Sequence, residues 1–288
     1  MNIPLIVQSS IWFVHGLFGS CPPLWTHSNG TFTPDLVRVA FPNARVFLWK
    51  NLGERELRQN GNNLAYAVAN SRIDGTERPI IFVAHGLGGL VVQQALLLSL
   101  EPVDPRLNYV ATDTAGIIYL GAPQMFSYIK RLRYTLARWF EFLRRPHGRV
   151  LSYIKQRAEL FGGIIYSFGA QALSDAGQLN HVEQFYFWEG HSMDIGGRVV
   201  PKYASYEPGM GYCCRHASHM DMIKFSGLND PGFMDLANVI YDWILRYTEQ
   251  QQQPEEEVED DPAPPYTSDG ESDIIELCAP AVGIDEGH

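Results

Sequence analysis

Cysteine is scarce in this sequence, and its scarcity excludes a disulfide-stapled domain. Four cysteines occur in 288 residues; two of them, Cys213 and Cys214, are adjacent, and none has the spacing of metal ligands. This pattern is typical of a reducing compartment. We therefore expect no metal ion and no cofactor.

The sequence also lacks a secretory signal and an uninterrupted apolar run. No basic segment precedes an apolar stretch at the N-terminus. The most apolar window, residues 79–100, is broken by histidine, glycine and glutamine. A strand, a tight turn and a buried helix explain this window better than a membrane span does. The sequence thus predicts a cytoplasmic protein.

Basic residues are missing from the C-terminal part, which has no Lys or Arg from Gln251 to His288 but holds twelve acidic residues. The formal net charge of −10 belongs to this tail, because residues 1–250 hold 22 basic against 20 acidic residues. A body so close to neutral predicts no nucleic-acid partner. We predict one domain, residues 1–249, and a disordered acidic tail, residues 250–288, which buries too little apolar surface to fold.

A short apolar segment, Ile274–Leu277, interrupts the acidic tail. Disordered segments with an apolar core and acidic flanks can add a strand to a basic-rimmed sheet edge, as SUMO-binding motifs do. The segment therefore predicts a SUMO-like partner. The alternative is a tail that is merely solvated.

Apolar strands alternate with helical patterns along the body, and this alternation predicts a parallel sheet with helices on both faces. The expected strands are 10–14, 45–49, 79–84, 116–120, 182–188 and 198–200, and the expected helices are 33–40, 54–72, 87–100 and 235–248.

Residues 126–160 depart from this alternation. Apolar residues recur there at three- and four-residue spacing, and basic residues fill the other faces. We predict a helical cap inserted at about 124–180 over the carboxyl edge of the sheet. A basic amphipathic helix can also lie on an anionic membrane, so the cap is a candidate for peripheral contact with an intracellular membrane.

The turn after the strand at 79–84 has the context of a nucleophile elbow, in which a strand, the sequence G-x-S-x-G and a helix follow one another. Ala84 and Gly88 are the small residues that flank the nucleophile. The nucleophile position itself holds Gly86, which has no side chain to attack with. The motif therefore predicts an elbow without its reactive group.

Four motifs in order resemble the intracellular lipase-like branch of α/β hydrolases that includes GPI inositol-deacylases and the serine-active-site proteins common in fungi. They are VHGLFGS from Val14, FPNARV from Phe41, RPIIFVAHGLGGLVV from Arg78 and GIIYLGAP from Gly116. The resemblance implies the α/β-hydrolase fold. It departs at Gly86, where the branch has serine, and at Gln124, where it usually has histidine.

The resemblance also assigns the remaining site residues. The backbone N–H groups of Leu17 and Leu87 would form the oxyanion hole. His219, which precedes Met-Ile-Lys-Phe, would be the base, with His216 as the alternative. Glu189 after the strand at 182–188 would orient that base, with Asp194 as the alternative.

A triad without its serine limits what the protein can do. Loss of that serine costs about 10⁶ in turnover, and the other groups retain roughly 10³–10⁴ over water. We expect a catalytically impaired or non-catalytic member that binds an acyl or lipid small molecule or a protein partner. The alternatives are an active ester or lipid hydrolase whose water is activated by His219 and Glu189, and an esterase in which Gly86 is a nucleophile mutation.

Overall fold

The computed structural model describes residues 8–16, 21–49, 57–72, 78–101, 104–122, 157–190 and 211–252. All of them lie in one compact unit, Met1–Gln253. The predicted tail beyond Gln252, the predicted strand at 198–200 and the part of the predicted cap before Arg157 lie outside the described residues.

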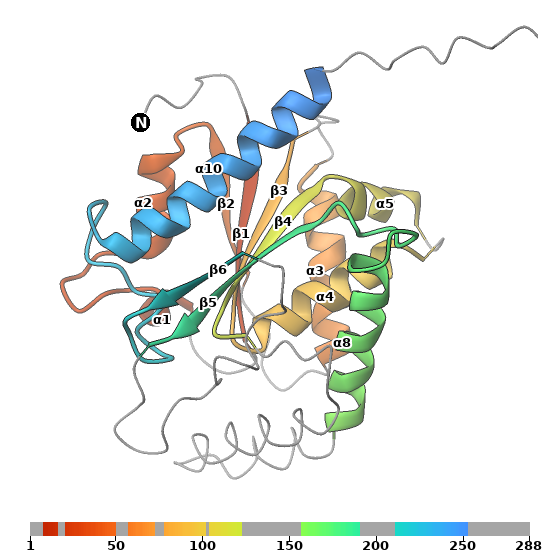
Figure 1. Ribbon diagram of the computed structural model, residues 1–288, viewed down its shortest axis with the longest axis horizontal. Coiled ribbons are helices and arrows are strands. Elements are labelled where there is room, and N and C mark those ends of the chain that lie inside the picture. The colour runs from red at the N-terminus through yellow and green to blue at the C-terminus, as the bar shows by residue number, and fades with distance from the viewer. Residues whose placement is uncertain are drawn as a thin grey trace, which may run out of the picture. The chain divides into compact units, whose positions relative to one another are not determined.

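In the described part of the chain, six strands form one sheet at the centre of the fold (Figure 1). They are β1 (Ser9–His15), β2 (Ala44–Trp49), β3 (Ile80–His85), β4 (Thr114–Leu120), β5 (Glu183–Glu189) and β6 (Gly211–Arg215). Their order is β2-β1-β3-β4-β5-β6, and every neighbouring pair is parallel. The predicted parallel sheet is confirmed.

The strand order reverses direction at β1. The chain runs from β1 outward to β2, then returns past β1 to form β3 on its other side. In open α/β sheets, ligands bind beyond the carboxyl ends of the strands at such a reversal. The last residues of β1 and β3, His15 and His85, are register partners there. This edge is therefore where a site is expected.

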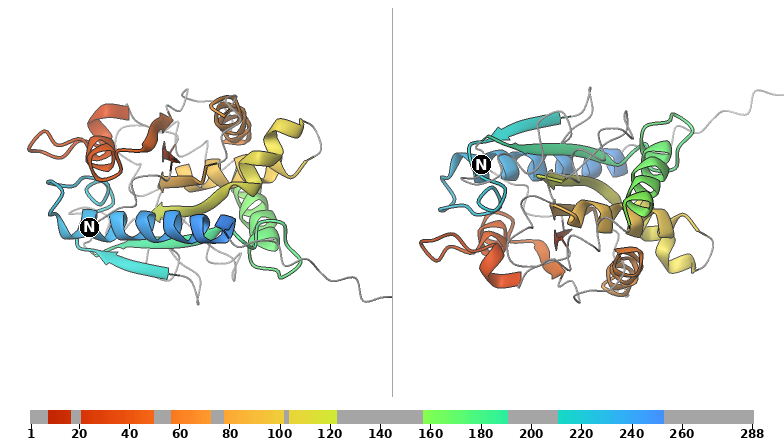
Figure 2. Two further views of the ribbon diagram at one scale, coloured as in Figure 1. Left: turned by 90° about the horizontal axis from the view of Figure 1, so that it is seen from above. Right: turned by 90° about the horizontal axis from the view of Figure 1, so that it is seen from below.

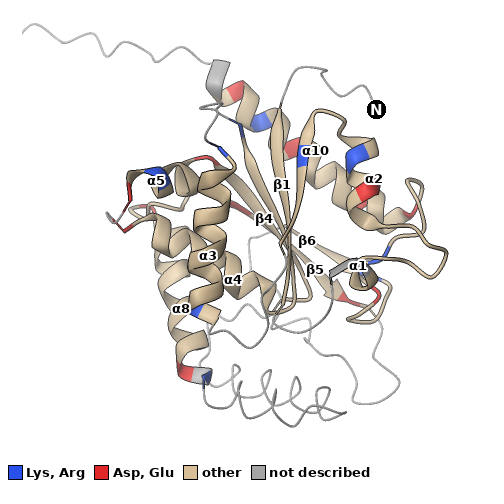
Figure 3. Ribbon diagram, turned by 180° about the vertical axis from the view of Figure 1, so that it is seen from behind, with Lys and Arg blue, Asp and Glu red and all other residues tan. Residues whose placement is uncertain are grey.

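Among the described residues, four helices cover the first face of the sheet: α3 (Leu57–Asn70), α4 (Gly88–Ser99), α5 (Pro105–Thr112) and α8 (Ala158–Ala172). Alternate strand residues, among them Trp12, Phe82 and Tyr119, pack beneath them in one apolar cluster. Figure 3 shows charged residues on the outer helices and none on α4 or the central strands. The central helix is thus a core element.

The other face is covered by α2 (Thr33–Ala40) and α10 (Pro231–Gln252), and the single turn α1 (Cys21–Leu24) follows β1. Phe13, Val83 and Ile118 point to this side, since strand side chains alternate between faces. The two views of Figure 2 show helices on both sides of the sheet, as predicted.

Helix α8 falls within the range predicted as a cap. Its Phe161, Ile164, Ile165 and Phe168 are buried in the same apolar cluster as α4. The described part of that range is therefore a helix of the layer beside the sheet. Among the described residues, no helix is long and apolar enough to span a bilayer.

The last part of the domain was predicted least well. β6 was not anticipated, because Gly-Tyr-Cys-Cys-Arg is a half-exposed edge strand without an apolar run. The final helix begins at Pro231 rather than at Asp235. Asp230 Oδ1 accepts the Gly232 N–H (3.0 Å) and so caps the helix. Pro231 stands at the first helical position, where the backbone N–H that proline lacks would have no partner within the helix.

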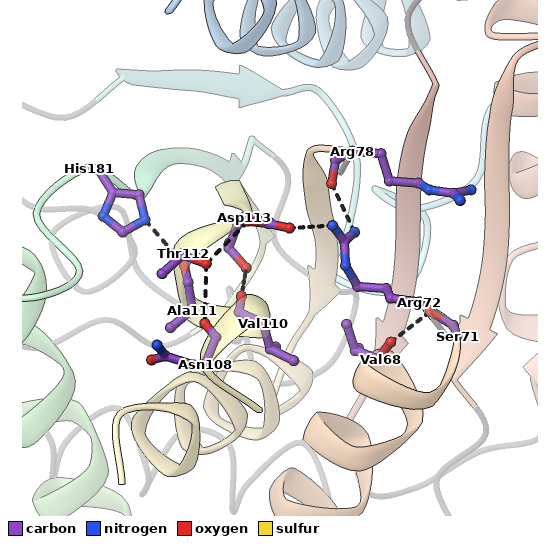
Figure 4. A network of polar contacts seen from close by, with 11 residues as sticks. Val68, Ser71, Arg72, Arg78, Asn108, Val110, Ala111, Thr112, Asp113 and His181 are labelled. Carbon is purple, nitrogen blue, oxygen red and sulfur yellow. Dashed lines mark hydrogen bonds and ion pairs between the residues drawn. The ribbon is translucent and has the colours of Figure 1, made fainter. Parts of the chain in front are cut away.

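A polar network joins α3, β3 and α5 at the amino ends of β3 and β4 (Figure 4). Arg72 forms an ion pair with Asp113, and its guanidinium also donates to the Arg78 carbonyl (2.8 Å). Thr112 Oγ1 donates to Asp113 (3.1 Å). The Arg72 and Asp113 side chains are 7% and 13% exposed. This network fixes α3 and α5 to the amino ends of β3 and β4, at the edge of the sheet opposite the carboxyl ends where a site is expected.

Candidate functional site

The turn between β3 and α4 has the backbone of a nucleophile elbow. Gly86 has a φ of 56°, in the left-handed region that side chains rarely adopt. Its N–H donates to the Leu120 carbonyl (3.1 Å), and its carbonyl accepts the Gly89 N–H (3.2 Å). The chain therefore leaves the sheet and enters the helix within one turn, with position 86 at its tip.

Small residues are required around this turn because two main-chain segments, the end of β1 and the start of α4, approach each other closely there. A Cβ at Gly88 would lie 2.4 Å from the Val14 carbonyl oxygen of β1. A Cβ at Gly16, just beyond β1, would lie 3.1 Å from the Leu87 nitrogen. The end of β1 thus lies directly against the start of α4.

One of the two expected oxyanion donors lies in the described structure. Leu87 is the N-cap residue of α4, and its N–H makes no hydrogen bond among the described residues. Such a donor beside the elbow can stabilise negative charge on a ligand oxygen. The other expected donor, Leu17, lies outside the described residues, as do Gln124 and Asp194.

The structure brings Glu189 and His219 together. Glu189 is the last residue of β5 and His219 lies in the loop after β6; they are 0% and 2% exposed. His219 Nδ1 and Glu189 Oε1 are 2.9 Å apart, so Nδ1–H donates to the carboxylate. This contact selects the tautomer that a general base in a triad needs. His216, the alternative base, is exposed. The catalytic roles of the pair stay predictions.

The pair lies beside the elbow. Gly121 directly follows Leu120, whose carbonyl binds the Gly86 N–H. A Cβ at Gly121 would lie 2.9 Å from His219 Nδ1, and Gly121 also has a positive φ of 57°. Glycine at 121 therefore makes room for the imidazole next to position 86.

His85 has a role that no motif in the sequence indicated. Its Nε2 lies 3.0 Å from the carbonyl oxygen of His219, to which it donates. The two rings are 4.6 Å apart between centroids. His85 thus ties the backbone of His219 to the end of β3. A contact across 134 residues leaves no local pattern in the sequence.

His15 and His85 are both neutral in this fold. Burial holds the pKa of His85 well below its ordinary value, and His219 and His15 nearby lower it further. Burial also lowers the pKa of His15 to about 4, although the hydrogen bond to the Gly16 carbonyl (2.9 Å) opposes this. Neither ring therefore adds positive charge to the site at neutral pH.

The loop that carries His219 is held at both ends by Arg215. Its guanidinium pairs with Asp230 (3.2 Å), donates to the Lys224 carbonyl (3.2 Å) and lies over the Phe225 ring (4.7 Å). Asp230 also accepts the Ser226 N–H (3.0 Å). These contacts fix the loop from which the imidazole projects.

The part of the chain that the structure describes holds no group of three or more His, Cys, Asp or Glu side chains arranged to bind a metal ion. What it does hold is an imidazole–carboxylate pair, a main-chain donor at a helix N-terminus and a glycine with a positive φ at the tip of the turn. These groups can bind and polarise a carbonyl or carboxylate group.

Comparisons with known proteins agree with this fold. No family model matches the chain. A segment of 64 residues is 39% identical to Protein SERAC1 of Danio rerio, but it covers 21% of this chain and 9% of that protein. So short a match shows no family for the whole chain.

Solved structures match over most of its length. The match to the mature lipase BlEst2 of Bacillus licheniformis covers 81% of this chain and 93% of the lipase chain, with 17% identity and a TM-score of 0.50. The match to phospholipase PlaB of Legionella pneumophila covers 85% of this chain and 62% of the phospholipase chain, with 12% identity and a TM-score of 0.48. The parallel sheet, the helices on both faces and the likeness to the Bacillus lipase together give this chain the α/β-hydrolase fold.

Proposed function

We propose that this protein is a catalytically impaired α/β hydrolase of the lipase and esterase type, which binds an acyl or lipid ligand at the elbow. One observation carries the proposal: the turn at Gly86 has the conformation of a nucleophile elbow, beside a buried His219–Glu189 pair. Without a nucleophile, the expected loss is about 10⁶ in turnover. Binding is the function that the remaining groups support best.

Restoring the hydroxyl tests the proposal. The Gly86→Ser variant should react with a fluorophosphonate probe and hydrolyse a short p-nitrophenyl ester, whereas the native protein should do neither. The serine must adopt a positive φ, so we expect a stability cost on the order of 1–3 kcal/mol. Circular dichroism and urea unfolding check that the variant is folded.

Two second substitutions serve as controls in the Gly86→Ser background. His219→Ala should remove both reactions, because the base is lost. His216→Ala should leave them intact, because that ring is exposed. A folded Gly86→Ser variant that neither labels nor hydrolyses would show that the site has lost more than its nucleophile.

The alternative function is hydrolysis by water, and the 2.9 Å contact between His219 and Glu189 favours it. The imidazole would take a proton from water as the oxygen attacks the ester carbonyl, and would return that proton to the leaving alcohol. This enzyme would turn over an ester without fluorophosphonate labelling, and His219→Ala would stop the turnover. Turnover of the native protein that depends on His219 would replace binding with this function.

A further inference from the structure

We propose that the ligand bound at the elbow is a free monocarboxylate with an alkyl chain, such as a fatty acid, rather than an ester. This inference rests on the proposed binding function and names the chemical class of its ligand. It follows from what glycine at position 86 changes in the site, in space and in charge.

The space argument compares a carboxylate with the acyl-enzyme of a serine hydrolase. In that intermediate the acyl carbon bears two oxygens, a carbonyl oxygen in the oxyanion hole and the serine oxygen near the base. A free carboxylate has the same acyl carbon and the same two oxygens. Because Gly86 has no hydroxymethyl group, the second carboxylate oxygen can take the place of the serine oxygen. A serine there would exclude it.

The charge argument starts from the Leu87 N–H. This donor stands at the N-terminus of the twelve-residue helix α4, where the helix dipole favours an anion. Position 16 has no Cβ, which would otherwise lie 3.1 Å from the Leu87 nitrogen. One carboxylate oxygen is expected at this donor.

The second oxygen is served by His219. Glu189 accepts the Nδ1–H (2.9 Å), which leaves Nε2 to take the proton of the bound carboxylic acid. The acid then becomes a carboxylate, and the buried carboxylate of Glu189 balances the charge of the ring. The triad of a serine hydrolase uses this charge arrangement to stabilise an oxyanion beside its imidazolium. A bound carboxylate has the same charge as that oxyanion, whereas an ester or an alcohol has none. The site is therefore complementary to an acid.

Titration calorimetry of the full chain with three probes of equal chain length tests this inference. Octanoate should bind more tightly than octanamide or octanol by roughly tenfold or more, which corresponds to about 1.4 kcal/mol. In the complex, ¹⁵N spectra should show protons on both ring nitrogens of His219. Equal affinity for all three probes would overturn the inference while leaving acyl binding in place. Binding of none of them would overturn both.

Substitutions locate the effect. His219→Phe should abolish the preference for octanoate, and His216→Phe, at an exposed position, should preserve it. If His219→Phe fails to fold because buried Glu189 loses this partner, the double variant His219→Phe/Glu189→Leu makes the same test. Gly86→Ser should weaken octanoate binding by about tenfold or more, because its hydroxyl occupies the place of one carboxylate oxygen. A preference for octanoate that survives His219→Phe, or an octanoate affinity that Gly86→Ser leaves unchanged, refutes the geometry.

Discussion

Gly88→Ala should destabilise the protein although alanine is the better helix former. Gly88 begins α4, and a Cβ there would lie 2.4 Å from the Val14 carbonyl oxygen and 3.0 Å from the His15 carbonyl carbon. Both atoms belong to the backbone of β1, which is paired on both sides with β2 and β3. The neighbour therefore cannot turn away, as the end of a flexible side chain could.

The magnitude is the balance of two effects. Replacing glycine by alanine inside a helix gains about 1 kcal/mol of helix propensity. Overpacking in a core costs about 1–3 kcal/mol, and more where backbone must move. The contact is about 1 Å shorter than an ordinary van der Waals separation. We expect a net loss of about 2 kcal/mol in the free energy of unfolding.

Equilibrium unfolding in urea measures this loss, and Gly163→Ala is the matched control. Gly163 also lies inside a helix, α8, but a Cβ there would have no neighbour within 4 Å. It should gain about 0.5–1 kcal/mol. The reasoning is refuted if Gly88→Ala is as stable as Gly163→Ala, because close approach of β1 and α4 would then cost nothing.

Two further predictions concern buried polar groups. The pKa of His15 is about 4 in the folded protein and about 6.5 in the unfolded chain. The stability that the neutral ring contributes is therefore fully present above pH 6.5. It is lost as the pH falls toward 4, by on the order of 3 kcal/mol. His15→Asn should therefore reduce the decline of unfolding free energy between pH 7 and pH 4, and an unchanged decline would contradict this. Asp113→Ala should lower the free energy of unfolding by about 3–5 kcal/mol, because the buried Arg72 side chain loses its carboxylate. Asp35→Ala, which removes an exposed ion pair with Arg38, should lower it little. Equal losses of stability on thermal unfolding would disprove the distinction.

The sheet and the central elements could be predicted because their signals are local. Strand 79–84 and helix 87–100 correspond to β3 (Ile80–His85) and α4 (Gly88–Ser99), since apolar runs and the glycines between them occupy adjacent positions in the sequence. Helix α5 was missed, although Asp104 accepts the Arg106 N–H (3.0 Å) as an N-cap and Pro105 follows it. That capping signal is present in the sequence.

The sequence indicated two side chains that lie together in the structure, but not the contacts that hold them; their catalytic roles stay predictions. A motif identified Glu189 and His219, and the structure brings them within 2.9 Å of one another. No pattern indicated that His85 binds the His219 carbonyl or that Arg215 pairs with Asp230, because these contacts depend on how separate segments pack. Burial also decides that His15 and His85 are neutral, and burial is a property of the fold.

β6 lies at the edge of the described sheet, and its pairing with β5 decides whether Glu189 and His219 stay together. Glu189 ends β5, whereas His219 is reached only through β6, which pairs along one side with β5 and has no fully buried residue. Local opening of such an edge needs less free energy than global unfolding. A transient detachment of β6 with its loop would separate the imidazole from its carboxylate while the central strands stay paired. The lifetime of the assembled pair then depends on the local stability of this edge, to which the Arg215–Asp230 ion pair and the contact of His85 with the His219 carbonyl both contribute.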